Sequence, residues 1–267
     1  MFDDVKHYNI KLSDIKINGR NVGEEDFEFK AEDVNNFMFE KNKNNFAQMD
    51  KNTVKATNQL KESEYIRFEN PEGKGMRVLF AGNSITLHGV KEDIGWFNEW
   101  GMAASAKEKD YVHVAMSGIQ KENPDAVFCI SQVARWETSY KNPEEIYPLY
   151  EASRNFDADV IVARFVENCS GKDFDEAVFE KNYEEFLKFL SPSGKAKYII
   201  TTGFWKHPGD EAIKRVAQKL NAPCIYLGDL GEMDEMKAVG LFEHSGVAAH
   251  PGDKGMSEIA KLILENM

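Results

Sequence analysis

Residues 77–86 read RVLFAGNSIT, and this stretch decides the fold. Its first half is an apolar run as long as one strand, and the Gly-Asn pair that follows is a turn signal. In a sheet of parallel strands, ligands bind beyond the carboxyl ends of the strands. Ser84 comes directly after such an end, which makes it a candidate nucleophile. A helix N-cap is the equally weighted alternative, since serine and asparagine both cap helices well.

Downstream of this stretch, strand-like runs alternate with helical ones, which is typical of a parallel sheet with helices on both faces. We expect strands at residues 77–82, 126–131, 159–166, 197–203 and 223–228. Apolar residues recur at helical spacing over residues 179–190, 213–220 and 256–263. The sequence therefore predicts a three-layer α/β/α domain over residues 73–267.

The first 72 residues follow a different pattern. Short alternations of apolar and polar residues are broken by Asn-Gly and Gly-Glu turns. We expect a small β-rich domain over residues 1–72, with a linker at Asn70 to Gly75. The alternative is that these strands extend the main domain. An exposed edge strand in this region could pair with a second copy of the chain, so a homodimer remains open.

Composition excludes several classes of function. The chain has 267 residues, 42% of them hydrophobic, so it can bury a full core. A net charge of −12 argues against a nucleic-acid partner, because phosphate binding needs a clustered basic surface. Apolar runs stay far below the roughly 20 residues of a membrane span, and Met-Phe-Asp-Asp does not begin a signal peptide. We expect a cytoplasmic protein without a membrane partner.

Cofactor and metal motifs are also missing from the sequence. It has no Walker A motif, no G-x-G-x-x-G fingerprint and no H-E-x-x-H or clustered cysteine and histidine ligands. The three cysteines, Cys129, Cys169 and Cys224, form no C-x-x-C pair, and we expect buried free thiols. The sequence predicts no cofactor and no metal.

Two later segments match the requirements of a serine nucleophile. His250 begins the run HPGDKGM before an amphipathic C-terminal helix, and an apolar strand at 160–166 runs into Glu167 and Asn168. A serine hydroxyl becomes a good nucleophile when an imidazole accepts its proton. The negative oxygen of the tetrahedral intermediate then needs preorganised N–H donors. Ser84, His250 and Asn168 would supply these three functions.

In their order and spacing, these three segments resemble the motifs of the SGNH/GDSL hydrolases, which are serine esterases and lipases with a flavodoxin-like fold. The resemblance covers residues 77–267. It implies that Ser84 is the nucleophile, His250 the general base, and Asn168 an oxyanion donor together with the Ser84 backbone N–H. Some carbohydrate esterases of this wider family pair an N-terminal β-domain with the hydrolase domain, as residues 1–72 would here.

The chain departs from the family pattern at several positions. The aspartate expected three residues before the base is replaced by Val247. Glu243 is a tentative substitute, and a backbone carbonyl that orients the ring of a Ser-His dyad is the alternative. The second-block glycine has no counterpart, so the backbone N–H of Ala134 or Arg135 would take its place in the oxyanion hole. Val166 and Cys169 replace the family's glycine and aspartate on either side of the third block.

His207 opens a second copy of the sequence His-Pro-Gly-Asp. Both copies precede helices, and Asp210 and Asp253 suit helix N-caps or first-turn acids, so the tetrapeptide could be helix-entry chemistry at both places. The position of His250 after the fifth strand and before the last helix favours it as the base.

The remaining candidates are substrate contacts: His88, Ala134, Arg135, Trp136 and Trp205. Aromatic rings at the rim of a site can stack on a sugar or hold an acyl chain, although core packing explains Trp136 and Trp205 equally well. Arg135 and Arg164 could bind an anionic group, or pair with Glu137 or Glu167.

From these features we expect a serine esterase that hydrolyses a small acyl ester, with acetyl and an acetylated carbohydrate favoured. The alternative is an inactive or slow carbohydrate-binding module on the same fold, because a fold can keep its site and lose its chemistry. A thioesterase or lysophospholipase is a third reading.

Overall fold

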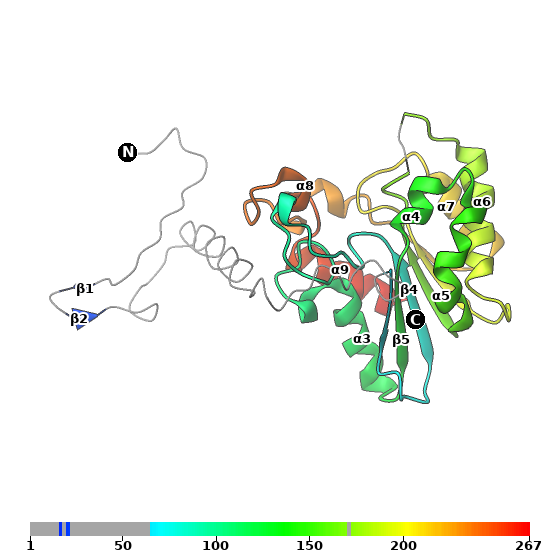
Figure 1. Cartoon of the computed structure of the whole chain (residues 1–267), viewed down its shortest axis with the longest axis horizontal. Coiled ribbons are helices and arrows are strands. Elements are labelled where there is room, and N and C mark those ends of the chain that lie inside the picture. Colours follow the sequence, from blue (N-terminus) through cyan, green and yellow to red (C-terminus); the bar gives the residue numbers. More distant parts are fainter. Residues whose placement is uncertain (1–15, 18–19, 22–64, 170–171) are drawn as a thin grey trace.

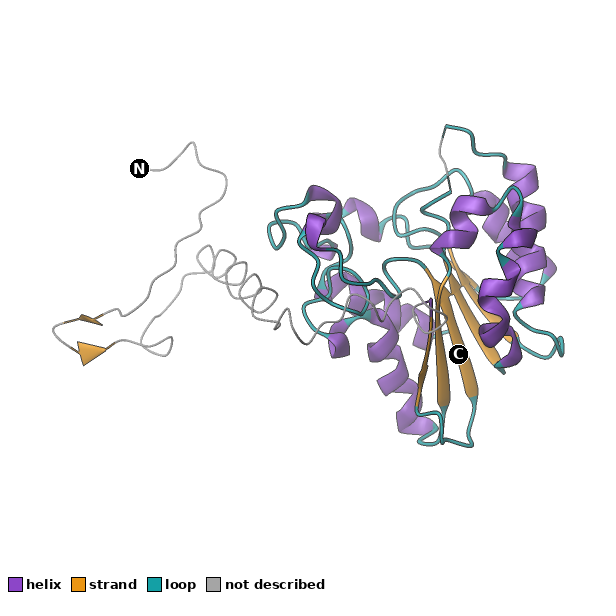
Figure 2. Cartoon of the chain, viewed as in Figure 1, coloured by secondary structure: helices purple, strands orange, loops and turns teal. Residues whose placement is uncertain are grey.

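The computed structural model describes residues 16–17, 20–21, 65–169 and 172–267. A sheet forms the centre of the main body (Figure 2). It has six strands in the order β3-β5-β4-β6-β7-β8. Its strands are β3 (Ile66–Glu69), β4 (Arg77–Gly82), β5 (Val127–Gln132), β6 (Val160–Arg164), β7 (Lys197–Thr201) and β8 (Cys224–Ile225). A separate antiparallel pair joins β1 (Lys16–Ile17) to β2 (Arg20–Asn21).

Five of the six strands run parallel, and β3 pairs with β5 in the antiparallel direction. Counted along the chain from β4, the parallel strands lie in the order second, first, third, fourth, fifth, which is the flavodoxin-like order. The predicted α/β fold with a parallel sheet is therefore confirmed. From β4 the chain adds β5 on one side and then β6, β7 and β8 on the other, so the strand order reverses between β4 and β6, and ligands bind at such a switch point.

Helices cover both faces of the sheet (Figure 1). The α-helices are α3 (Tyr111–Glu122), α4 (Ala134–Ser139), α5 (Glu151–Asn155), α6 (Glu176–Phe189), α7 (Asp210–Lys219), α8 (Ser245–Ala248) and α9 (Asp253–Leu264). Short 3-10 helices occupy Glu92–Ile94, Lys107–Lys109, Pro143–Glu145, Tyr147–Tyr150, Leu230–Glu232 and Asp234–Met236.

Alternation along β4 separates the two cores. Val78 and Phe80 point to the face covered by α3 and α9, whereas Leu79 and Ala81 point to the face covered by α4 to α7. All four side chains are fully buried. A strand buried on both faces must be apolar throughout, which is why the run at 77–82 is continuous rather than alternating.

A third, smaller apolar cluster lies beside the carboxyl edge of the sheet. Trp96, Met102 and Ala103 pack against Ala238 and Val247. This cluster joins the segment that follows Ser84 to the segment that precedes His250. It therefore anchors α8, and the loop after it, against the serine turn.

The domain boundary predicted between residues 72 and 73 needs correction. Strand β3 lies before that boundary and pairs with β5 from Ile66↔Ser131 to Glu69↔Phe128. The predicted linker is a turn between two strands of the same sheet, in which the Asn70 side chain donates to the Ala126 carbonyl at 2.8 Å. The sheet domain thus starts no later than residue 66. Apart from the β1–β2 pair, the predicted N-terminal β-rich domain lies outside the described residues.

Candidate active site

Ser84 lies in the turn that follows β4, at the carboxyl edge of the sheet. Two backbone hydrogen bonds close this turn, from the N–H groups of Thr86 (2.9 Å) and Leu87 (3.0 Å) to the carbonyl of Asn83. The carbonyl of Ser84 accepts from the N–H of Met102 at 2.8 Å. Within the described part of the chain, the Ser84 N–H has no acceptor. It is therefore available as a donor next to its own hydroxyl.

Gly82 allows the turn to fold back on its strand. A Cβ at this position would lie 1.8 Å from Oγ1 of Thr86 and 2.8 Å from the carbonyl oxygen of Arg164. The Thr86 hydroxyl cannot easily move away, because it shares a 2.6 Å hydrogen bond with the buried hydroxyl of Tyr111. The glycine of the GNS motif is thus required by packing.

The hydroxyl of Ser84 lies 2.9 Å from Nε2 of His250. The two residues are 166 positions apart in the chain, and the fold brings them together. On the other side of the imidazole, Nδ1 lies 2.7 Å from the carbonyl oxygen of Gly246. A carbonyl oxygen only accepts, so Nδ1 carries the proton and Nε2 is left to accept one from Ser84.

Gly246 therefore occupies the position that the orienting acid would take. Glu243, the tentative candidate for that role, is not the partner of Nδ1, because that partner is the Gly246 backbone carbonyl. Glu243 itself is an exposed residue. Val247, at the family's aspartate position, is fully buried in the third apolar cluster, where a carboxylate would have no solvent. Ser84 and His250 thus form a hydrogen-bonded pair whose imidazole is oriented by a backbone carbonyl, which is the geometry of the alternative left open by the sequence.

Two neighbours shape the environment of the imidazole. The ring of Trp205 meets that of His250 edge to face, with centroids 5.2 Å apart. Burial lowers the pKa of His250 to about 4, against a partial opposing effect of the Gly246 hydrogen bond, and the nearby His88 lowers it further. The imidazole of His250 is therefore neutral at pH 7 and has a nitrogen free of a proton. Burial also lowers the pKa of His88, whose backbone N–H donates to the Trp100 carbonyl at 2.9 Å.

Asn168 follows β6, across the switch point from Ser84. Its side-chain amide donates to Oε2 of Glu137 at 2.5 Å, and its backbone N–H lies 3.4 Å from Oε1 of the same carboxylate. Asn168 itself is exposed, although Glu137 is fully buried. The Nδ2 amino group has two hydrogens, so one remains for an acceptor on the substrate side.

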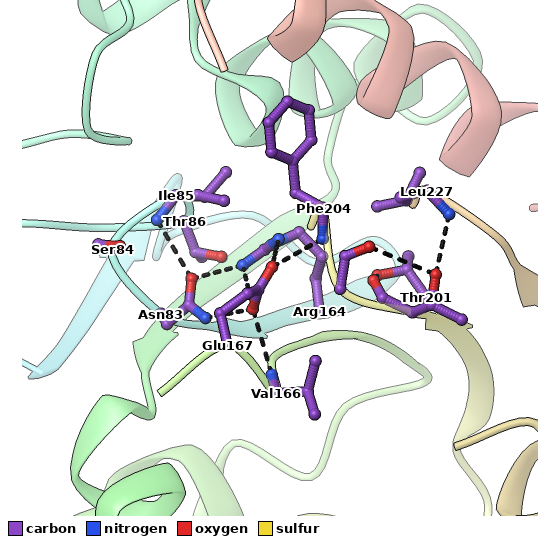
Figure 3. Close-up of polar contacts among 12 residues, drawn as sticks. Asn83, Ser84, Ile85, Thr86, Arg164, Val166, Glu167, Thr201, Phe204 and Leu227 are labelled. Carbon is purple, nitrogen blue, oxygen red and sulfur yellow. Dashed lines mark hydrogen bonds and ion pairs between the residues drawn. The ribbon is translucent and has the colours of Figure 1, made fainter. Parts of the chain in front are cut away.

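A buried polar network lies beneath the serine turn (Figure 3). The guanidinium of Arg164 donates to Glu167 through NH1 (2.7 Å) and NH2 (3.1 Å), and it also donates to Oδ1 of Asn83. Nδ2 of Asn83 donates to Glu167 (2.5 Å) and to Glu137 (2.9 Å). The backbone N–H of Phe204 also donates to Glu167, at 2.8 Å. Asn83, the residue before Ser84, is thus held by the side chains of Arg164, Glu167 and Glu137.

The two glutamates of this network differ in their proton affinity. Burial and the neighbouring charge of Glu167 raise the pKa of Glu137 to about 7. Burial also works against the charged form of Glu167, but the adjacent Arg164 outweighs it and holds the pKa of Glu167 below its usual value. Glu167 is therefore the constant partner of Arg164, and Glu137 is the member that titrates near neutrality.

The structure separates the predicted substrate contacts. Trp205 and His88 lie next to His250. Ala134 and the exposed Arg135 begin α4, and the N–H of the preceding Val133 donates to the Gly82 carbonyl at 2.7 Å, which ties the start of α4 to the end of β4. Trp136 is fully buried and stacks on Phe186 with centroids 5.0 Å apart, so it is a core residue and not a substrate contact.

His207 is held away from the serine. Its Nε2 lies 3.1 Å from the Cys169 carbonyl, its Nδ1 accepts from Gly209, and its backbone N–H donates to Asp210 at 2.9 Å. This copy of His-Pro-Gly-Asp is a helix-entry turn, and Asp210 is the first residue of α7. In the copy at 250–253, Asp253 likewise begins α9 and accepts from the backbone N–H of Ser105 at 2.8 Å.

Two residues of the site, Asn83 and Glu137, carry roles that the sequence reasoning missed. Arg164 was recognised only as a candidate anion binder or ion-pair partner, and it proves to be the ion-pair partner of Glu167. A usable signal exists: Glu137 and Glu167 lie within a few residues of the ends of two strands, β5 and β6, that end at the same edge of the sheet. Charged residues shortly after such strands meet at that edge, and one buried arginine at the end of β6 requires a carboxylate nearby.

Cys129 and Cys169 are buried free thiols, as expected, and Cys224 is half-buried. Burial raises the pKa of Cys129 to about 12, which makes it unreactive. Among residues 65–169 and 172–267, no helix is long and apolar enough to cross a bilayer, and no three His, Cys, Asp or Glu side chains are grouped to hold a metal ion.

No protein-family model matches the chain, and no curated protein sequence matches it significantly. Among solved structures, a significant match is the psychrotrophic esterase EstA from a Pseudoalteromonas species, in a form inhibited by monoethylphosphonate. It is 12% identical to this chain, the match covers 71% of this chain and 95% of that one, and the TM-score is 0.45. This likeness assigns no residue and no activity to the present chain.

Proposed function

We propose that this protein is a serine ester hydrolase that uses a Ser-His dyad. The observation that carries the proposal is the 2.9 Å contact between the Ser84 hydroxyl and Nε2 of His250, with Nδ1 held by the Gly246 carbonyl. A hydrogen-bonded serine and neutral imidazole, with the imidazole oriented by a third group, is the arrangement that activates a hydroxyl for attack on a carbonyl carbon.

The reaction follows from this geometry. Oγ of Ser84 attacks the ester carbonyl while Nε2 of His250 takes its proton, and the same proton then goes to the leaving alcohol. Water, activated by the same nitrogen, releases the acid from the acyl-serine. The oxyanion would be held by the Ser84 N–H, by the second amide hydrogen of Asn168 and by the backbone N–H of Ala134 or Arg135. One such donor contributes roughly 3–4 kcal/mol to transition-state stability.

We propose a small acyl group, with acetyl favoured, and an acetylated carbohydrate as the candidate alcohol part. Two features support a small group: Ser84 is only partly exposed, and the Trp205 ring stands directly against the base. Trp205 also offers an aromatic surface, which suits contact with a sugar ring.

Hydrolysis of p-nitrophenyl acetate by wild type, Ser84→Ala and Ser257→Ala tests the proposal. Ser257 is an exposed serine on α9 and serves as the matched control. Removal of the nucleophile should lower kcat by roughly 10⁴-fold or more, whereas the control should keep wild-type kinetics. A fluorophosphonate probe followed by intact mass should label wild type once and leave Ser84→Ala unlabelled.

Equal rates in wild type and Ser84→Ala, with Ser84 unlabelled, would contradict the hydrolase and favour the carbohydrate-binding module. If the activity depends on Ser84, the rates for p-nitrophenyl acetate, butyrate and octanoate identify the acyl class. A preference for octanoate would contradict the small acyl group and favour a thioesterase or lysophospholipase. Release of acetate from acetylated xylo-oligosaccharides tests the carbohydrate directly.

A further inference from the structure

Glu137 is a buried carboxylate that faces hydrogen-bond donors only. It lies on α4 with no exposed surface. Its carboxylate accepts hydrogen bonds from Nδ2 of Asn83 (2.9 Å), Nδ2 of Asn168 (2.5 Å) and the backbone N–H of Asn168 (3.4 Å). An ionised carboxylate accepts at both oxygens and donates nothing, which fits this set of partners. The hydrogen bonds as they stand therefore describe the charged form of Glu137.

The two asparagines depend on Glu137 to different degrees. Asn83 also donates to Glu167 and accepts from Arg164 and from the N–H of Ile85 (3.3 Å), so all of its hydrogen-bonding positions are filled. Asn168 is exposed, and within the described residues Glu137 is the one hydrogen-bond partner of its side chain. Loss of the Glu137 charge would leave Asn83 in place and release Asn168.

We propose that Glu137 is a positioning residue for ester hydrolysis, whose carboxylate holds the Asn168 amide with its NH₂ group toward the oxyanion. This inference rests on the proposed hydrolase function and on the donor role of Asn168 in it. A carboxylate at Glu137 accepts one amide hydrogen and leaves the other for the substrate oxygen. A preorganised donor of this kind needs no reorientation when charge develops in the transition state.

Protonation of Glu137 reverses the arrangement. Oε1 of Glu137 accepts from two N–H groups and Oε2 from the Asn168 amide, so the proton of the carboxylic acid belongs on Oε2 and faces the Asn168 side chain. Its O–H can donate to Oδ1 of Asn168 only when the amide turns over. The NH₂ group then points elsewhere and the oxyanion loses a donor. Burial and the charge of Glu167 raise the pKa of Glu137 to about 7, so this change falls near neutral pH.

Several titratable or charged groups surround Glu137. Arg164 and Glu167 face it from the end of β6, and Cys169 lies in the turn after them. Tyr183 faces it from α6, and Tyr150 from the 3-10 helix before α5. Burial raises the pKa values of both tyrosines and of Cys169 further above neutrality, so these groups stay uncharged near pH 7, and Arg164 stays charged. Glu137 is thus the member of this cluster whose charge changes near pH 7.

The test compares kcat–pH profiles of wild type, Glu137→Gln, Glu137→Asp, Asn168→Ala and the double variant Glu137→Gln/Asn168→Ala. Wild type should lose activity as pH falls through about 7, well above the acid limit set by His250. Glutamine offers one acceptor oxygen in place of two, so in Glu137→Gln kcat should fall by roughly 10-fold to 100-fold with little change in KM. This loss is somewhat smaller than the loss expected when an oxyanion donor itself is removed. The limb near pH 7 should vanish in Glu137→Gln and persist in Glu137→Asp.

The double variant tests whether Glu137 acts through Asn168. If it does, Glu137→Gln should lower kcat by less than about 3-fold in the Asn168→Ala background, because residues that act through one contact are not additive. If the fold-losses in kcat of the two single variants multiply in the double variant, the proposal is overturned. A Glu137→Gln enzyme with wild-type kcat and pH profile would overturn it too.

A second comparison does not require Glu137→Gln to fold. In Asn168→Ala the limb near pH 7 should be absent, since protonation of Glu137 then has no donor to displace. A limb that persists in Asn168→Ala overturns the inference while the hydrolase stands. A wild-type protein whose turnover does not depend on Ser84 overturns both the hydrolase function and the role of Glu137. That result is seen in the Ser84→Ala comparison and not in the pH profiles.

Discussion

The carbonyl oxygen of Gly246 lies 2.7 Å from Nδ1 of His250, four residues further along the chain. A peptide carbonyl fixes the tautomer and the orientation of the ring as a carboxylate would. It brings no full negative charge to stabilise the imidazolium, however, and a carboxylate does. The imidazole of His250 is therefore oriented by a neutral group, and burial outweighs the rise in its pKa that the Gly246 hydrogen bond causes.

The first prediction concerns the titration of His250. Because burial disfavours the imidazolium, its pKa is lowered to about 4 from a usual value of 6.5. The ring should stay neutral as pH falls through 6.5 and take its proton only near pH 4. The C–H signals of the ring in NMR spectra, assigned by their loss in His250→Gln, measure this midpoint. A midpoint at or above 6.5 would contradict the desolvation of the imidazole.

The same shift has a consequence for stability. Between pH 6.5 and 4 the unfolded chain binds a proton at this residue and the folded protein does not, so His250 makes the folded state less stable as pH falls through this window. The unfolding free energy of His250→Gln should therefore fall less steeply with decreasing pH over the same range.

A second prediction concerns Trp205, whose ring covers that of His250 at 5.2 Å. Trp205→Ala should let water reach the imidazole and raise its pKa toward the usual value, because desolvation is the main cause of the shift. The same NMR titration measures it. Trp100→Ala is the matched control: Trp100 is also partly buried, but its ring contact is with Trp96. A pKa that stays near 4 in Trp205→Ala would show that other groups exclude the water.

A third prediction concerns the family's acid position. Val247 is fully buried against the cluster of Trp96 and Met102, and the position beside Nδ1 is already filled by Gly246. Val247→Asp should therefore bury an unpaired carboxylate, lower the unfolding free energy by about 3–5 kcal/mol and leave kcat no higher. Asparagine has the shape of aspartate without the charge, so the unfolding free energy lost in Val247→Asn should depend less on pH than that lost in Val247→Asp. A gain in kcat would mean that the loop can rearrange into a triad.

A fourth prediction follows from the close approach at Gly82. In Gly82→Ala the new methyl would lie 1.8 Å from the Thr86 hydroxyl, which Tyr111 holds in place. Overpacking should lower the unfolding free energy by about 1–3 kcal/mol, and the displaced turn should lower kcat. Gly118→Ala on α3 is the control, because its methyl meets only the flexible end of Leu264. Denaturant unfolding of both variants measures the difference; equal stabilities would contradict the steric argument.

The fold was largely predictable because its signals are local. The strand expected at 77–82 has these bounds in the structure, since an apolar run between a charged residue and a Gly-Asn turn has clear ends. The last strand is only Cys224–Ile225, shorter than the expected 223–228, because it pairs with β7 at two positions. Strand β3 was assigned to another domain because four residues that alternate between apolar and charged do not indicate which strand they will pair with.

The parts of the candidate site that lie in sequence motifs were predictable. The parts that depend on the path of the backbone were not. Ser84, His250 and Asn168 follow strands or precede a helix in a recognisable order. The Gly246 carbonyl could not be inferred, because every residue has one and only the path of α8 brings this one to the ring. Trp136 illustrates the opposite error, since its place after a strand end resembles a rim position although the ring packs under α6.

A fifth prediction concerns the ion pair beneath the serine. Arg164 is fully buried and binds Glu167 through two N–H groups, so Arg164→Met would leave a buried carboxylate without its counter-charge. The unfolding free energy should fall by about 3–5 kcal/mol. Arg215 is the matched control on α7: it donates one N–H group to each of two glutamates at the surface, and Arg215→Met should lower the unfolding free energy by at most about 1 kcal/mol.

Urea unfolding of both variants at pH 7 makes this comparison, and a shift to pH 5 sharpens it. With Arg164 removed, burial is no longer opposed and the pKa of Glu167 should rise, so protonation at pH 5 should recover part of the stability lost by Arg164→Met. Arg215→Met should show no such recovery. If Arg164→Met and Arg215→Met lower the unfolding free energy by the same small amount, water must reach Glu167. The network beneath Ser84 would then be hydrated and not dry.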